Sequence, residues 1–102
     1  MRTRRGTDPT LLVLSSLASG PKHGYALTKD IEAFAGVSLG PGTLYGCLSR
    51  LDAQGWVEPM EADDRRRPYR LTGAGAAELR ARLEEARVVA RVGLRRLAGG
   101  AP

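Results

Sequence analysis

The chain has 102 residues and a formal net charge of +5, from 16 lysines and arginines against 11 aspartates and glutamates. This length fits one domain with a modest core, and this charge favours a polyanionic partner. One cysteine excludes an internal disulfide, and one histidine and one cysteine are too few for a zinc site. No apolar run approaches the roughly 20 residues that span a bilayer. We therefore expect a cytoplasmic protein without cofactor, membrane segment or catalytic centre.

The first predicted helix follows a basic stretch, residues 1–7, that we expect to be a flexible end. Asp8 is suited to the N-cap and Pro9 to the first helical turn. The residues from Leu11 to Ala18 are apolar on more than one side, which is typical of a helix shared between a core and a partner. We therefore place Leu11 and Leu14 at a partner interface.

A second helix is predicted from the apolar residues Leu27, Ile31 and Phe34, which recur at helical spacing. Lys22 and His23 lie at its start, where free backbone N–H groups favour phosphate binding. Ordinary surface positions explain these two residues equally well. We interpret Tyr25 as core packing, and do the same for Cys47 and Trp56 further along the chain.

The third predicted helix begins at Pro41, after the N-cap Gly40, and ends before Gly55. Its buried stripe consists of Leu44, Cys47, Leu48 and Leu51. Its other face has no carboxylate and consists of Gly42, Thr43, Tyr45, Gly46, Ser49 and Arg50. Such a face can lie against phosphates and base edges without repulsion, and two helices joined by a short glycine-containing connection form a helix-turn-helix. The alternatives are a plain surface helix, a half-buried Tyr45 and an Arg50 paired with an acid.

A small β-hairpin follows, with strands predicted in residues 56–61 and 69–71 and an edge position for Pro59. Its charged tip contains the basic residues Arg65, Arg66 and Arg67. A solvated turn would explain these arginines, but the neighbouring helix-turn-helix favours DNA contact. Three helices and this hairpin make a winged helix-turn-helix over residues 8–72.

The last helix is predicted over residues 73–97, capped by Thr72, with 98–102 as a second flexible end. A helix of about 25 residues spans roughly 37 Å, which is too long for a small core to cover. Heptad-like spacing predicts a dimer seam of Leu79, Leu83, Ala86, Ala90 and Leu97, flanked by Leu94. The alternative is that these residues pack back on their own domain. The fold class is therefore mainly α with a small β-hairpin and a C-terminal dimerisation helix.

Five segments, together with the apolar first helix, resemble the PadR family of bacterial transcriptional regulators, in the branch with a short C-terminal helix. They are Gly20–Tyr25, Pro41–Tyr45, Leu48–Leu51, Gly55–Val57 and Arg67–Thr72. The resemblance implies a homodimer that binds double-stranded DNA, usually as a repressor. It also implies DNA contacts by Thr43 and Tyr45 and by the hairpin arginines, and release by a drug-like effector in some relatives. Gly46 stands where many members have proline, and Asp63 and Asp64 weaken the field of the hairpin tip.

Two functions of different classes remain open from the sequence. The first is a sequence-specific regulator that binds a pseudo-palindromic operator as a homodimer and is released by a small apolar effector. The second is a winged-helix module that recognises proteins. The lack of carboxylates in residues 42–50 favours the first.

Overall fold

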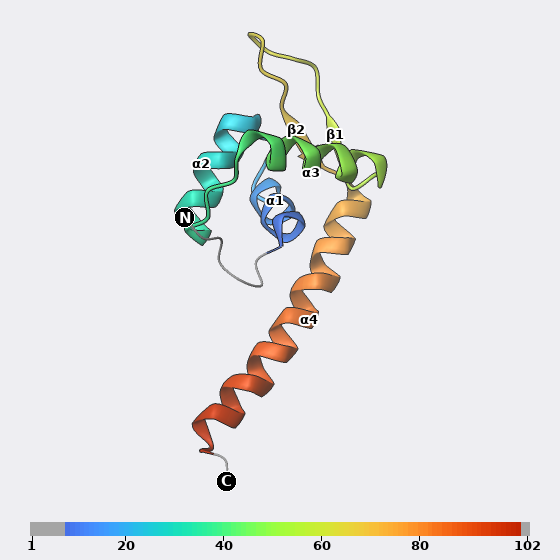
Figure 1. Cartoon of the computed structure of the whole chain (residues 1–102). Coiled ribbons are helices and arrows are strands. Elements are labelled where there is room, and N and C mark those ends of the chain that lie inside the picture. The colour runs from blue at the N-terminus through green and yellow to red at the C-terminus, as the bar shows by residue number, and fades with distance from the viewer. Residues whose placement is uncertain (1–7, 101–102) are drawn as a thin grey trace.

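The computed structural model describes residues 8–100, which form four helices and one hairpin. In chain order these are α1 (Pro9–Leu17), α2 (Gly24–Ala35), α3 (Pro41–Ala53), β1 (Val57–Pro59), β2 (Tyr69–Leu71) and α4 (Gly73–Ala98). Figure 1 shows the first three helices grouped together, the hairpin projecting on one side and α4 extending away on the other. The predicted fold class, a mainly α winged helix-turn-helix followed by a long helix, is confirmed.

The helix ends follow local sequence signals. Asp8 caps α1 by accepting a hydrogen bond from the backbone N–H of Thr10 at 2.9 Å. Thr72 caps α4 in the same way, through the N–H of Gly75 at 3.0 Å. Gly36 ends α2 in the left-handed conformation with φ 68°, which glycine adopts without steric cost. Each cap satisfies backbone groups that the helix itself leaves unpaired. The predicted end at residues 1–7 lies outside the described part of the chain, as do residues 101–102, whereas Ala98 still belongs to α4.

Helix α1 lies at the centre of the core and contacts α2, α3, α4 and β2. The core comprises the buried residues Leu12, Val13, Leu14, Leu17, Leu27, Ile31, Val37, Leu39, Leu44, Cys47, Leu48, Leu51, Val57 and Leu79. Two residues that we expected at the dimer interface belong to this set. Leu14 is 0% exposed and Leu79 is 6% exposed, because the chain's own elements surround them. The interface prediction is therefore wrong for these two, whereas Leu11 remains partly exposed.

The second helix buries less than its spacing predicts. Tyr25 is 67% exposed and Phe34 is also exposed, so both differ from the expected core packing. Tyr25 is two residues before the buried Leu27 and thus about 160° around the helix from it. Of the other helices, α1 and α3 contact α2 most, and its remaining surface faces outward.

The hairpin is antiparallel, with Val57 opposite Leu71 and Pro59 opposite Tyr69. The free edge of β2 pairs with the segment before α2. The N–H of Lys22 donates to the carbonyl of Tyr69 at 3.1 Å, and the N–H of Tyr69 donates to the carbonyl of Lys22 at 3.0 Å. This pairing, which the sequence did not predict, fastens the hairpin to the helix-turn-helix and leaves Pro59 on the outer strand, as expected.

The base of α4 is packed tightly against the start of β1. A Cβ on Gly75 would lie 2.0 Å from the carbonyl oxygen of Trp56, so no larger residue fits there without movement. Arg82 stacks over the Trp56 ring at 5.4 Å and binds the carboxylates of Asp8, at 3.4 Å, and Glu78, at 2.8 Å. These contacts fix the direction in which α4 leaves the domain (Figure 1). None of the helices in residues 8–100 is long and apolar enough to cross a membrane.

Candidate nucleic-acid interface

Helix α3 separates buried and exposed residues as its sequence predicts. Leu44, Cys47, Leu48 and Leu51 are buried against the core. Burial raises the pKa of the Cys47 thiol, although a hydrogen bond with Thr10 acts in the opposite direction, so the thiol is protonated at neutral pH. Cys47 is therefore a small apolar core residue, as expected. Within residues 8–100, no group of three His, Cys, Asp or Glu side chains is placed to hold a metal ion.

The opposite face of α3 is exposed and carries Thr43, Tyr45, Ser49 and Arg50. No carboxylate lies between Pro41 and Leu51, and Arg50 forms no ion pair with any carboxylate of the described residues. Hydroxyl groups and an unpaired guanidinium donate hydrogen bonds to phosphate oxygens and base edges without electrostatic repulsion. This exposure is what a DNA-reading helix requires.

A concave surface of about 300 Å³ joins α3 to the start of α2 and to the hairpin. It is lined by His23, Gly24, Tyr25, Tyr45, Arg65, Arg66, Arg67 and Tyr69. None of these residues is acidic, and five of them are sites predicted from the sequence: His23, Tyr45 and the three arginines. The fold thus brings three separate segments together into one cationic and aromatic surface.

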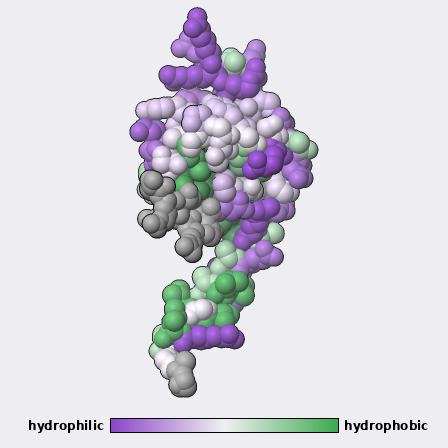
Figure 2. Space-filling view, viewed as in Figure 1, coloured by the Kyte–Doolittle hydropathy of each residue, from purple (hydrophilic) through white to green (hydrophobic). Residues whose placement is uncertain are grey.

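The hairpin tip is a two-residue turn with unusual backbone angles. Asp63 and Arg66 exchange backbone hydrogen bonds of 2.7 and 2.9 Å, and the two residues between them, Asp64 and Arg65, have φ of 53° and 71°. Positive φ at both central positions is type I′ geometry, whose twist matches that of an antiparallel hairpin. Arg67 braces the hairpin, since its Nη1 donates to the carbonyl of Met60 at 2.8 Å. Figure 2 shows this strongly hydrophilic tip projecting from the domain.

Lys22 differs from its expected role as a phosphate contact. Its ammonium donates to the carbonyls of Ser16 and Gly20 and, at 2.7 Å, to the hydroxyl of Ser19. The end of α1 exposes backbone carbonyls with partial negative charge, and these attract the cation. His23 instead caps α2, because its Nδ1 accepts the N–H of Ala26 at 3.4 Å.

Two residues of the concave surface, Gly24 and Tyr69, were missed by the sequence reasoning, and a third, Tyr25, was assigned to the core. The position of Tyr25 opposite Leu27 on the helical wheel was a usable signal. Gly24 and Tyr69 had none, since their place depends on how α2, α3 and the hairpin pack.

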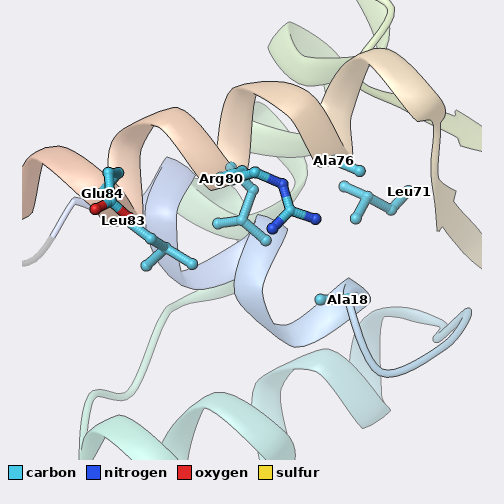
Figure 3. Close-up of a pocket in the computed structure, with 7 residues that line it drawn as sticks. Ala18, Leu71, Ala76, Arg80, Leu83 and Glu84 are labelled. Carbon is cyan, nitrogen blue, oxygen red and sulfur yellow. The ribbon is translucent and has the colours of Figure 1, made fainter. Parts of the chain in front are cut away.

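A second cavity, of about 390 Å³, lies between the end of α1, β2 and α4. Figure 3 shows Leu71, Ala76 and Leu83 among its apolar lining residues, with Arg80 and Glu84 from α4 beside them. Its size is within the range of small-molecule sites.

The outer half of α4, residues 83–98, presents apolar side chains to solvent. Its exposed large apolar residues are Leu83, Val88, Val89, Leu94 and Leu97, and Leu97 is 80% exposed. Figure 2 shows a hydrophobic area on the extended part of the molecule. Of the predicted seam, Leu83, Ala86, Ala90, Leu94 and Leu97 are all exposed in the single chain.

The fold and this surface define a winged helix-turn-helix protein with an extended C-terminal helix. The family model for PadR-like transcriptional regulators matches residues 13–81, and the chain belongs to this family.

Three known proteins show how similar the relatives are. The transcriptional regulator Rv3488 of Mycobacterium tuberculosis is 39% identical over 82 residues, covering 78% of this chain and 76% of that protein. An uncharacterized 37.1 kDa protein in transposon Tn4556 of Streptomyces fradiae is 52% identical over 71 residues, 70% of this chain; the match spans only 21% of that protein. The crystal structure of a PadR family transcription regulator from Clostridium difficile has the same fold, with TM-score 0.79 and 23% identity over 87% of this chain and 97% of the other.

Proposed function

We propose that this protein is a DNA-binding repressor that acts as a homodimer on a pseudo-palindromic operator in the bacterial cytoplasm. The observation that carries the proposal is the concave surface whose lining has no acidic residue, joined through Tyr45 to the carboxylate-free exposed face of α3. The exposed Asp63 and Asp64 adjoin this surface only at the hairpin tip. Membership of a family of transcriptional regulators supports DNA as the ligand of this surface.

The residues of this surface divide by chemistry. Arg50, Arg65 and Arg66 are exposed cations suited to phosphates, and they set the register of the protein on the duplex. Thr43, Tyr45 and Ser49 lie on the helix that enters the major groove and sample base edges. Gly42 and Gly46 leave room for the DNA backbone to approach α3 closely. His23 lines the concave surface. Arg67 supports the hairpin through its hydrogen bond to the carbonyl of Met60.

Homodimerisation is supported by the uncovered apolar face of α4. A helix of 26 residues is about 39 Å long, and only its first turns reach the chain's own core. A second copy would cover Leu83, Ala86, Ala90, Leu94 and Leu97, with Leu11 of α1 beside them, in an interface that is the same on both subunits. The two α3 helices would then enter successive major grooves about 34 Å apart.

The first test measures binding to DNA from upstream of the protein's own coding sequence by fluorescence anisotropy. If the dimer neutralises about 6–10 phosphates, affinity falls roughly 10³–10⁵-fold between 50 and 200 mM salt. Arg50→Ala should weaken binding and reduce the slope of log K against log salt by the amount expected for about one lost phosphate contact per subunit. Arg91→Ala is the matched control, because Arg91 is an exposed arginine of α4 that is not one of the predicted seam residues.

A flat salt response, or no binding at 50 mM salt, would instead favour a winged-helix module that recognises proteins. The repressor role is tested separately, with a reporter gene placed behind the bound DNA. Expression of the protein should lower the reporter signal, and Arg50→Ala should restore it. A rise in signal would identify an activator.

The cavity beside α4 supports an apolar small-molecule effector that releases the DNA. It lies against Leu79 and Leu83, at the base of the apolar face, so a ligand there can change how α4 is held. Thermal-shift screening tests this, since a ligand at 100 times its Kd stabilises the protein by about 2.7 kcal/mol. An active compound must also weaken DNA binding; stabilisation without release would exclude an inducer.

A further inference from the structure

Gly24, the first residue of α2, is in close contact with the recognition helix α3. A Cβ built on Gly24 would lie 2.0 Å from Tyr45 Oη, 2.8 Å from Cζ and 3.5 Å from Cε1. Carbon atoms in proteins pack at about 3.5–4.0 Å, so any side chain at position 24 would collide with the phenol ring. Tyr45 therefore lies across the first turn of α2.

The local backbone does not explain this glycine. Its φ is not in the left-handed region, unlike that of Gly36, so an alanine could adopt the same backbone. Alanine is also the better residue inside a helix. Contact with Tyr45 is thus the feature that requires a glycine at this position.

We propose that Gly24 is a positioning residue for DNA recognition. By lacking a side chain, it lets the Tyr45 phenol lie across α2 and sets the direction from which the hydroxyl meets DNA. The ring then forms one wall of the concave surface that also contains His23 and the hairpin arginines. The inference rests on the proposed DNA-binding function.

The predicted effect of Gly24→Ala is a displaced Tyr45 ring in a protein that still folds. The atoms that would collide with the new methyl group are at the free end of a half-exposed side chain, which can rotate away. In the proposed dimer one hydrogen bond from Tyr45 to a base edge is lost in each subunit, and the two losses together weaken binding at least about tenfold. Gly24→Ala should therefore bind operator DNA about tenfold more weakly than the wild type, close to the loss caused by Tyr45→Ala.

The test is a double-mutant cycle with the wild type, Gly24→Ala, Tyr45→Ala and the double variant, measured by anisotropy at one salt concentration. In the Tyr45→Ala background, Gly24→Ala should have no further effect, because no ring remains to be displaced. The control is Gly73→Ala, at the first position of α4, where a Cβ meets nothing within 4 Å. Thermal denaturation should show Gly24→Ala at least as stable as the wild type.

The outcomes separate the two levels of the proposal. If the wild type binds DNA and Gly24→Ala binds it equally well, the positioning role alone is overturned. A further loss in the double variant also overturns it, since Gly24 would then act without Tyr45. If the wild type binds no DNA, the proposed function fails, and the positioning role with it.

Discussion

The winged-helix part, residues 8–72, and the outer half of α4 both contain amphipathic helical sequence, but the apolar side chains are buried in the first and exposed in the second. In the first, Leu27, Ile31 and Leu48 are fully buried by neighbouring helices. In the second, Leu94 and Leu97 recur at similar spacing but remain in solvent. The periodicity shows that one face of a helix is apolar, whereas the distance from the domain decides whether the chain itself covers it. The uncovered face of α4 is the surface that the proposed second copy would cover.

The largest expected effect comes from the buried side of this comparison. Leu48→Ala removes a fully buried side chain from α3 and should lower the free energy of unfolding by about 2–5 kcal/mol. Chemical denaturation measures this loss. A change below about 0.5 kcal/mol would mean that the core of the winged helix is not packed as described.

Leu94→Asp tests the exposed side. If each subunit contributes about 1.5 kcal/mol from burying Leu94, the symmetric pair contributes about 3 kcal/mol, or more than a hundredfold in the dimer dissociation constant. Sedimentation measures the shift. Val88→Asp, on the opposite side of α4, is the matched control and should leave the dimer intact. Equal effects of the two substitutions would contradict the assigned interface.

The joint between the two regions is tested by Gly75→Ala. The new Cβ would lie 2.0 Å from the backbone oxygen of Trp56, which has little freedom to move, so we expect a loss of about 1–3 kcal/mol. Gly73→Ala, two residues earlier in the same turn, meets no atom and should be neutral or stabilising. Comparable denaturation midpoints for both variants would show that the close approach is absent.

Arg82→Ala should have the smallest effect, about 1 kcal/mol, because its ion pairs are partly exposed. Trp56 is the only tryptophan, so its fluorescence reports this contact directly. Emission should shift to longer wavelength, because loss of the guanidinium exposes the ring to water. Arg87→Ala, which removes an ion pair with Glu84 further out on α4, should leave the emission unchanged.

Much of the fold followed from local patterns. The caps Asp8 and Thr72 and the buried stripe of α3 were predicted and confirmed. The exposed polar face of α3 and the basic hairpin tip were also predicted, whereas their roles in DNA binding stay predictions. The predictions were wrong where an apolar side chain could be buried either by its own domain or by a partner. Leu14 and Leu79 were assigned to a partner, but their own domain covers them.

The sequence by itself determined the order of helices and strands, the caps of α1 and α4 and the buried stripe of α3, because caps, turns and periodicity act within a few residues. Tertiary structure alone decided that Lys22 binds the end of α1, that Gly75 lies against Trp56 and that Gly24 receives the Tyr45 ring. Each of these contacts joins different elements. Which atoms meet depends on how those elements pack in three dimensions, and no local pattern encodes that geometry.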